Sequence, residues 1–212
     1  MPKILSSVDV LQFRQRLCDI ALSTFAEHGV EGLSLRNLAA AAGCSRSTPY
    51  RYFKNKADIL AAVRESAFRR TADSMEAVAE SVDDPVERLE ALAKAYLEHA
   101  LERPDAYRVM HAVSHQDEQQ YPELLKQIKR SQRPMLQAVN DAIDAGSVEG
   151  DAINIAHILW AGLHGIVSLH LSDKLHMGRD IEELGAVMIR TLGRAIAVSP
   201  SGEPATQRIM EV

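Results

Sequence analysis

Basic, hydroxyl and aromatic side chains gather between residues 46 and 56, and this is the stretch whose residue types could do chemistry. The set is Arg46, Ser47, Thr48, Tyr50, Tyr52, Lys54 and Lys56. Guanidinium, ammonium and hydroxyl groups donate hydrogen bonds to phosphate oxygens and to the edges of bases. A short segment with so little apolar surface cannot be held by burial alone, so its exposed face predicts that it binds another molecule, which we expect to be double-stranded DNA.

Two short helices joined by a tight turn are expected to position these side chains. Ser34 is a candidate N-cap, with Leu33 and Leu38 as a hydrophobic staple, for a helix over residues 35–42. Gly43 follows where a left-handed residue ends the helix. A second helix over residues 46–53 is expected after the candidate N-cap Ser45, with Phe53 as its apolar anchor. The spacing is typical of a helix-turn-helix, whose second helix enters the major groove.

A third helix is expected to begin directly after this pair. Asn55 is its candidate N-cap, Lys56 is its first residue, and Asp58 stands three residues past the cap in a capping-box-like arrangement. A helix N-terminus carries free N–H groups and a partial positive charge. Together with Lys54 and Lys56, this terminus predicts a seat for a DNA phosphate.

The pattern over this region resembles the TetR family of transcriptional regulators. The residues that carry the resemblance are Leu17, Ala21, Phe25, Gly29, Ser34, Leu38, Ala39, Gly43, Thr48, Tyr50, Phe53, Lys56 and Leu60. Pro49 departs from it, because the family more often has leucine or another apolar residue there. Since proline crowds the carbonyl four residues back, the first turn of the second helix is expected to begin nearer Ser47.

The resemblance implies a role for each DNA-facing position. Base edges or nearby phosphates would be contacted by Arg46, Ser47, Thr48 and Tyr50. The sugar-phosphate backbone would be held by Ser34, Arg36, Tyr52, Lys54 and Lys56. Backbone contacts fix the register on the duplex, whereas base contacts read the sequence.

The charge of the chain is distributed unevenly. Its 212 residues carry a net charge of −5, yet residues 1–70 hold 11 Lys and Arg against 6 Asp and Glu, and the remainder holds 13 against 23. A basic head on an acidic body is expected when only one end meets phosphate. The two cysteines and the lack of an apolar leader predict a cytoplasmic protein.

The whole chain is expected to be all-α, with about nine helices and no strand. The expected helices cover residues 9–28, 35–42, 46–53, 56–81, 85–102, 105–114, 122–145, 151–172 and 180–198. Pro134 lies inside the seventh and predicts a kink or division near Arg130. The expected domains are a three-helix DNA-binding domain over 1–66, a helical bundle for ligand binding and dimerisation over 67–198, and a disordered tail over 199–212.

The last two helices are expected to form a homodimer interface. Residues 151–172 are apolar nearly all round, so a second subunit is the natural cover for the side that faces away from the chain's own core. Gly162 and Gly165 would let another helix approach closely. We expect a four-helix bundle with closed twofold symmetry, which the family resemblance also implies, and hence a palindromic operator. Three histidines in the stretch count against a membrane span.

A candidate ligand site centres on Trp160 and His164, which lie one helical turn apart. With Gly165 they resemble the signature of the WHG subgroup of TetR ligand-binding domains. The candidate lining residues are Tyr96, Tyr107, Met110, Met135, Trp160 and His164. The alternative is that the same side chains only pack the helical core, and the sequence leaves this open.

The function expected from these features is a sequence-specific transcriptional repressor that a small-molecule ligand releases from its operator. An activator or a ligand-independent DNA-binding protein is the alternative. A metal-responsive regulator is a weaker one, since His111 and His115, four residues apart, could share a metal with His157 or His164. No catalytic motif is present, so no enzyme activity and no cofactor are expected.

Overall fold

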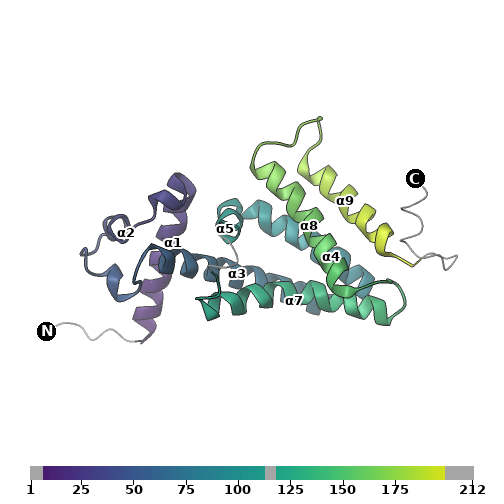
Figure 1. Ribbon diagram of the computed structural model, residues 1–212, viewed down its shortest axis with the longest axis horizontal. Coiled ribbons are helices and arrows are strands. Elements are labelled where there is room, and N and C mark those ends of the chain that lie inside the picture. Colours follow the sequence, from purple (N-terminus) through teal and green to yellow (C-terminus); the bar gives the residue numbers. More distant parts are fainter. Residues whose placement is uncertain (1–6, 113–117, 199–212) are drawn as a thin grey trace. The chain divides into compact units, whose positions relative to one another are not determined.

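The computed structural model describes residues 7–112 and 118–198 (Figure 1). Within these ranges every regular element is helical, which confirms the all-α fold class. The elements are α1 (Ser7–Gly32), α2 (Leu35–Ala41), the 3-10 helix η1 (Pro49–Arg51), α3 (Lys56–Ser81), α4 (Pro85–Glu102), α5 (Pro104–Met110), α7 (Pro122–Asp144), α8 (Ala152–Leu171) and α9 (Ile181–Ile196). One isolated antiparallel bridge joins Val148 to Ala197.

Side-chain caps explain why α4 begins at the predicted residue and why α8 and α9 begin one residue after the predicted ones. The carboxylate of Asp84 accepts from the backbone N–H groups of Val86 and Glu87, each at 2.9 Å, and starts α4. In the same way Asp151 starts α8 and Asp180 starts α9. Each carboxylate satisfies backbone donors that have no partner inside the helix and lies at its positive end.

The ends of α1 and α5 differ most from the prediction, by four residues each. Gly29 has a φ of 64° and a ψ of −166°, so it interrupts α1 as expected, but a short helical turn resumes and runs to Gly32. α5 ends at Met110, short of the expected residue 114, because His111 leaves the helical region with a φ of −104° and a ψ of 10°.

Pro134 predicts a kink or a division near Arg130, and the division is wrong, because α7 runs through this proline as one helix. Proline removes one backbone hydrogen bond, whose acceptor would be the carbonyl of Arg130. Packing holds the helix beyond that point, since Ala138, Val139 and Ala142 are all completely buried. The buried side of the helix thus outweighs the missing bond.

The chain forms two compact units. The amino-terminal unit consists of residues 1–70 and 103–128, and the carboxy-terminal unit consists of residues 71–102 and 129–212. The domain boundary expected after residue 66 divides the chain at one position, whereas these two units are defined by spatial contacts and each contains two separate stretches of the chain. The difference is that α5 and the start of α7 group with the helix-turn-helix segment.

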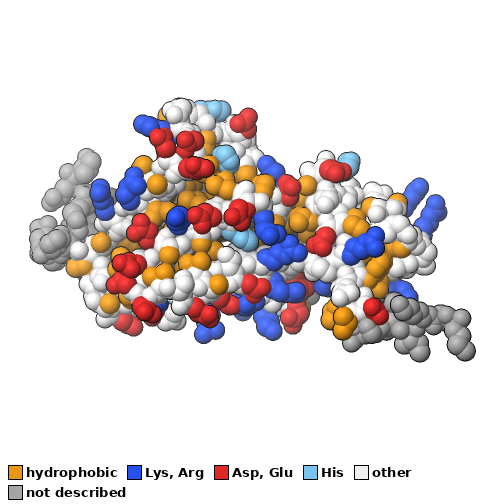
Figure 2. Space-filling view, turned by 180° about the vertical axis from the view of Figure 1, so that it is seen from behind, with side chains coloured by type: hydrophobic (Ala, Val, Ile, Leu, Met, Phe, Trp, Pro, Cys, Tyr) orange, Lys and Arg blue, Asp and Glu red, His pale blue; other side chains and the backbone are white. Residues whose placement is uncertain are grey.

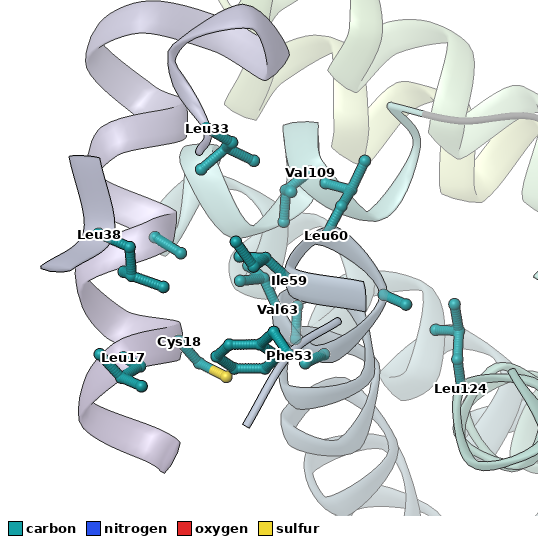
Figure 3. Close-up of a cluster of buried hydrophobic side chains, with 14 of the residues drawn as sticks. Leu17, Cys18, Leu33, Leu38, Phe53, Ile59, Leu60, Val63, Val109 and Leu124 are labelled. Carbon is teal, nitrogen blue, oxygen red and sulfur yellow. The ribbon is translucent and has the colours of Figure 1, made fainter. Parts of the chain in front are cut away.

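The core of the amino-terminal unit joins residues that lie far apart in the sequence. Leu17 and Cys18 of α1 pack with Phe53 and with the first turns of α3 (Figure 3). Val109 of α5 and Leu124 of α7 belong to the same buried cluster. The helix-turn-helix segment therefore rests on a core to which α5 and α7 contribute.

The carboxy-terminal unit has its own core between α3, α4, α7 and α8. Leu92, Val139 and Leu159 are among its buried members. Arg88 of α4 donates to the carboxylate of Asp141 at 2.6 Å, and this bond joins α4 to α7. Its guanidinium group also donates to the backbone carbonyls of Val82 and Asp83 in the loop before α4. Hydrophobic side chains also reach the surface of this unit in several places (Figure 2).

Candidate nucleic-acid interface

The first helix of the helix-turn-helix is capped as the sequence predicts. The hydroxyl of Ser34 accepts from the backbone N–H of Asn37 at 3.1 Å, and the Asn37 amide donates to the carbonyl of Gly32 at 3.0 Å. Gly43 has a φ of 64° and ends α2 in the left-handed region that favours glycine. Arg36 lies exposed on α2.

The α-helix predicted over residues 46–53 is wrong. Residues 46–48 form turns and only Pro49–Arg51 is helical, as a 3-10 turn. An α-helix starting at residue 46 would need an N–H at position 49 to donate to the carbonyl of Ser45, and proline has none. Instead the N–H of Thr48 donates to that carbonyl at 3.0 Å, which is the tighter 3-10 pattern.

Hydroxyl groups order the first turn of this reading segment, which we define as residues 45–53. The Ser45 hydroxyl lies 3.1 Å from the Ser47 hydroxyl and 2.8 Å from the Thr48 hydroxyl. Ser45 therefore connects the turn through side chains in place of the expected cap on backbone N–H groups. These contacts link the side chains of Ser47 and Thr48 to that of Ser45.

Two buried residues anchor the reading segment and leave the residues between them exposed. Pro49 and Phe53 are buried in the amino-terminal unit. Tyr50 between them is 62% exposed, and Arg46 and Ser47 are exposed as well. Tyr52 is half-buried, with its ring centroid 5.4 Å from that of Phe13. The proline that departs from the family pattern thus fills the apolar position that the pattern requires.

The start of α3 forms the reciprocal cap expected for a phosphate seat. The side chain of Asn55 accepts from the N–H of Asp58 at 2.9 Å, and the Asp58 carboxylate accepts from the N–H of Lys54 at 2.9 Å. Lys54 is exposed, and the ammonium group of Lys56 lies 3.4 Å from the carboxylate of Glu31. A fixed helix terminus beside two lysines is suited to an anion.

The candidate ligand residues are divided between the two units. Tyr107 and Met110 belong to the amino-terminal unit and are buried there, and Met110 is a member of its core cluster. The other four, Tyr96, Met135, Trp160 and His164, belong to the carboxy-terminal unit. Packing alone is sufficient to explain the two buried residues.

Trp160 and His164 share one face of α8, as their spacing predicts. Their ring centroids are 5.3 Å apart, and Nε2 of His164 lies 3.2 Å from the Ser168 hydroxyl. Partial burial lowers the pKa of His164 below the usual value for histidine. Trp160 is 43% exposed in the single chain.

Sequence reasoning missed a set of polar contacts behind the interface. Arg64 and Glu118 form a buried ion pair, and the Tyr121 hydroxyl donates to the Asp58 carboxylate at 3.2 Å. No pattern pointed to them, since their separations of 54 and 63 residues carry no local signal. For the metal alternative, His115 lies outside the described residues, and no group of three or more His, Cys, Asp or Glu suited to a metal occurs within them.

The described part of the chain has helices as its regular elements, a capped first helix and exposed polar side chains in the reading segment, and these are the features of a helix-turn-helix DNA-binding protein. Residues 17–63 match the family model described as bacterial regulatory proteins of the tetR family. Residues 89–192 match the model described as the tetracyclin repressor-like C-terminal domain. The chain therefore belongs to the TetR family of transcriptional regulators, which bind DNA and are not enzymes.

Individual relatives are similar over different lengths. The AcrR regulator of Shigella flexneri is 29% identical over 106 residues, which are 50% of this chain and 49% of that protein. A helix-turn-helix regulator of Staphylococcus aureus (strain bovine RF122 / ET3-1) is 41% identical over 51 residues, 24% of this chain and 28% of that one. The chain thus spans between about a quarter and a half of the length of these curated relatives.

One solved structure is similar over almost the whole chain. It is a protein with unknown function from Rhodococcus sp. RHA1, with a TM-score of 0.76 and 29% sequence identity. The similarity covers 93% of this chain and 99% of that one. The fold of this chain is therefore one that another solved chain also adopts.

Proposed function

We propose that this TetR-family regulator is a homodimeric repressor that a small-molecule ligand releases from a palindromic operator. The observation that carries the proposal is the reading segment, in which Arg46, Ser47 and Tyr50 are exposed beside the buried anchors Pro49 and Phe53. These exposed side chains have no part in the core, so binding is the role left for them. Base contacts are assigned to Arg46, Ser47, Thr48 and Tyr50, and backbone contacts to Ser34, Arg36, Tyr52, Lys54 and Lys56.

The surface of α8 supports a dimer. Ile153, Ile158, Trp160 and Leu169 are large apolar residues of this helix that stay exposed in the single chain. Among the described residues α8 is also the one helix whose length and composition would suit a membrane span. A second copy of α8 and α9 would cover this surface by twofold symmetry, as regulators of this family generally bind DNA as dimers.

The helix α3 supports a route from a ligand to the DNA. It begins in the phosphate seat at Lys56 and ends at Ser81, and its last part belongs to the carboxy-terminal unit. A ligand that binds one conformation of that unit better than another would shift the separation of the two reading segments in a dimer. Two reading segments must match a fixed groove spacing, so operator binding would weaken.

Selection of bound duplexes from a random DNA pool tests the DNA-binding part. We expect wild-type protein to recover a palindrome, and we expect Tyr50→Ala and Lys56→Ala to weaken binding to it. Lys56→Ala should also reduce the slope of log affinity against log salt by about one for each phosphate that the lysine no longer neutralises. Lys94→Ala is the matched control, because Lys94 is an exposed lysine of the other unit. If no DNA sequence is enriched, the proposal that this protein binds DNA sequence-specifically is refuted.

The dimer is tested by sedimentation of a charged variant. Ile158→Asp places a carboxylate on the exposed apolar surface of α8, and we expect a monomer with weakened operator binding. Val86→Asp is the matched control, because Val86 is 45% exposed on α4 compared with 54% for Ile158. A dimer that survives Ile158→Asp unchanged would contradict the proposed interface.

The ligand part can be followed directly, because Trp160 is the only tryptophan in the chain. Dodecanoate and tetraphenylphosphonium are suitable first probes, one an apolar anion and the other an apolar cation. We expect an inducing ligand to change Trp160 fluorescence and to release the operator at the same concentration. The alternative, an activator or a ligand-independent regulator, is favoured if the operator lies upstream of a promoter whose transcription the protein increases.

A further inference from the structure

A four-residue turn directly before α7 is bonded to α3 at two points. The turn runs from Glu118 to Tyr121 and is closed by a backbone bond from the Tyr121 N–H to the Glu118 carbonyl at 2.9 Å. Its first residue pairs with Arg64, and its last donates a hydroxyl hydrogen bond to Asp58. All of these residues lie in the amino-terminal unit.

The ion pair between Arg64 and Glu118 is buried. Arg64 and Glu118 are only 3% and 6% exposed. The guanidinium group also donates to the carbonyl of Met110 at 2.8 and 3.0 Å, where α5 ends. A buried ion pair with additional hydrogen bonds allows few alternative arrangements. The turn therefore has a defined position against α3.

The hydrogen bond from Tyr121 to Asp58 connects the turn to the proposed phosphate seat. One carboxylate oxygen of Asp58 accepts from the Lys54 N–H at 2.9 Å, and the other accepts from the Tyr121 hydroxyl at 3.2 Å. The N–H of Asp58 in turn donates to the side chain of Asn55 at 2.9 Å. One half-buried carboxylate thus connects the turn before α7 to the loop that carries Lys54.

We propose that Tyr121 is a positioning residue of the DNA-binding surface, which acts through Asp58 to hold the Lys54–Lys56 segment in its phosphate-binding geometry. This inference rests on the proposed role of that segment as a backbone contact. Tyr121 itself is not proposed to touch DNA. Its hydroxyl keeps the Asp58 carboxylate oriented toward the Lys54 N–H, and it also offsets part of a negative charge that would otherwise repel phosphate.

Loss of the hydroxyl has a defined consequence. In Tyr121→Phe the ring still packs against the buried cluster, and the change removes the hydroxyl and with it the hydrogen bond to Asp58. Asp58 is then free to turn toward water and to release the Lys54 N–H. A hydrogen bond to a charged group corresponds to a change of roughly 13-fold to 160-fold in an equilibrium constant, of which DNA affinity reports only the transmitted part.

The test compares DNA binding and amide exchange in the full-length protein. For Tyr121→Phe we expect a threefold to tenfold weaker affinity, which is a transmitted part of the effect of one such bond, for the palindrome that wild-type protein selects. We also expect faster hydrogen exchange at the Lys54 amide in DNA-free protein, with the thermal midpoint nearly unchanged. Glu123→Gln is the control, because Glu123 lies in the first turn of α7 and pairs with the exposed Lys126.

A double-variant cycle separates a positioning role from a general effect on folding. If Tyr121 acts through Asp58, Tyr121→Phe has no further effect on affinity in an Asp58→Ala background. Equal, additive losses in both backgrounds would overturn the proposal, as would unchanged Lys54 exchange in Tyr121→Phe. The exchange measurement needs no DNA. If wild-type protein selects no duplex, the proposed function fails. Lys54 exchange in Tyr121→Phe then still shows whether Tyr121 holds the Lys54 segment through Asp58.

Discussion

The buried pair of Arg64 and Glu118 yields the sharpest stability prediction. Arg64→Met keeps much of the length of the side chain but removes the guanidinium group. The Glu118 carboxylate, 6% exposed, then loses the cation that pairs with it, and the Met110 carbonyl loses two donors. Removing one partner of a buried ion pair costs about 3 to 5 kcal/mol, because an uncompensated charge stays buried.

The double variant Arg64→Met with Glu118→Leu removes both charges. We expect it to recover part of the loss and to stay about 1 to 3 kcal/mol below wild type, since the two hydrogen bonds from Arg64 to the Met110 carbonyl are still missing. Arg69→Met is the control, because Arg69 is an exposed arginine that pairs with the half-buried Glu65 one turn away on the same helix. Such a pair contributes only about 0.3 to 0.5 kcal/mol.

Urea denaturation followed by far-ultraviolet circular dichroism measures all four proteins. The total protein concentration has to be equal in every experiment, because the proposed dimerisation would add to the apparent stability. A loss below about 1 kcal/mol for Arg64→Met would refute the reasoning, since it would mean that water reaches the carboxylate. A double variant that is less stable than the single one would refute it as well.

Three further predictions concern the caps, the core and the thiols. Ser34→Ala removes the 3.1 Å bond to the Asn37 N–H and should cost about 1 kcal/mol, measured as a lower thermal midpoint. Leu92→Ala empties a fully buried position and should cost about 2 to 5 kcal/mol in urea denaturation, whereas the same change at an exposed position would cost far less. Burial raises the pKa of Cys18 from 9.0 to about 11, so a thiol reagent at pH 8 should modify the half-buried Cys44 first. Because the folded-state pKa is the higher one, stability from Cys18 is complete below pH 9 and declines by about 2 to 3 kcal/mol as the pH rises to 11, a decline that Cys18→Ala should abolish.

Features set by neighbouring residues could be predicted from the sequence alone. The bounds of α3 and α4, the caps at Ser34 and Asn55, and the left-handed Gly43 all appear as expected. Caps, turns and helix periodicity depend on residues within about four positions of one another, so a single sequence contains the information. The family pattern, spread over most of the first 60 residues, identifies the fold in the same way.

The reading segment is a local feature for which the sequence prediction is wrong. Pro49 stands out as unusual, yet the pattern around it still predicts an α-helix. Because Pro49 has no N–H, the Ser45 carbonyl accepts from the N–H of Thr48 instead, and the segment forms a 3-10 turn. At Pro134 the same chemistry has the opposite outcome, because the completely buried residues that follow keep α7 continuous. Local sequence therefore indicates where a helix is weakened, while packing decides whether it ends there.

Contacts between distant segments were decided only by the tertiary structure. Nothing near Tyr121 or Glu118 in the sequence indicates that they bond to Asp58 and Arg64, because the partners are 63 and 54 residues away. The grouping of residues 103–128 with the DNA-binding segment has the same origin. Which residues could read DNA followed from the sequence, through residue type and local spacing. What holds those residues in place followed from the fold, because burial and long-range hydrogen bonds exist only once the helices have packed.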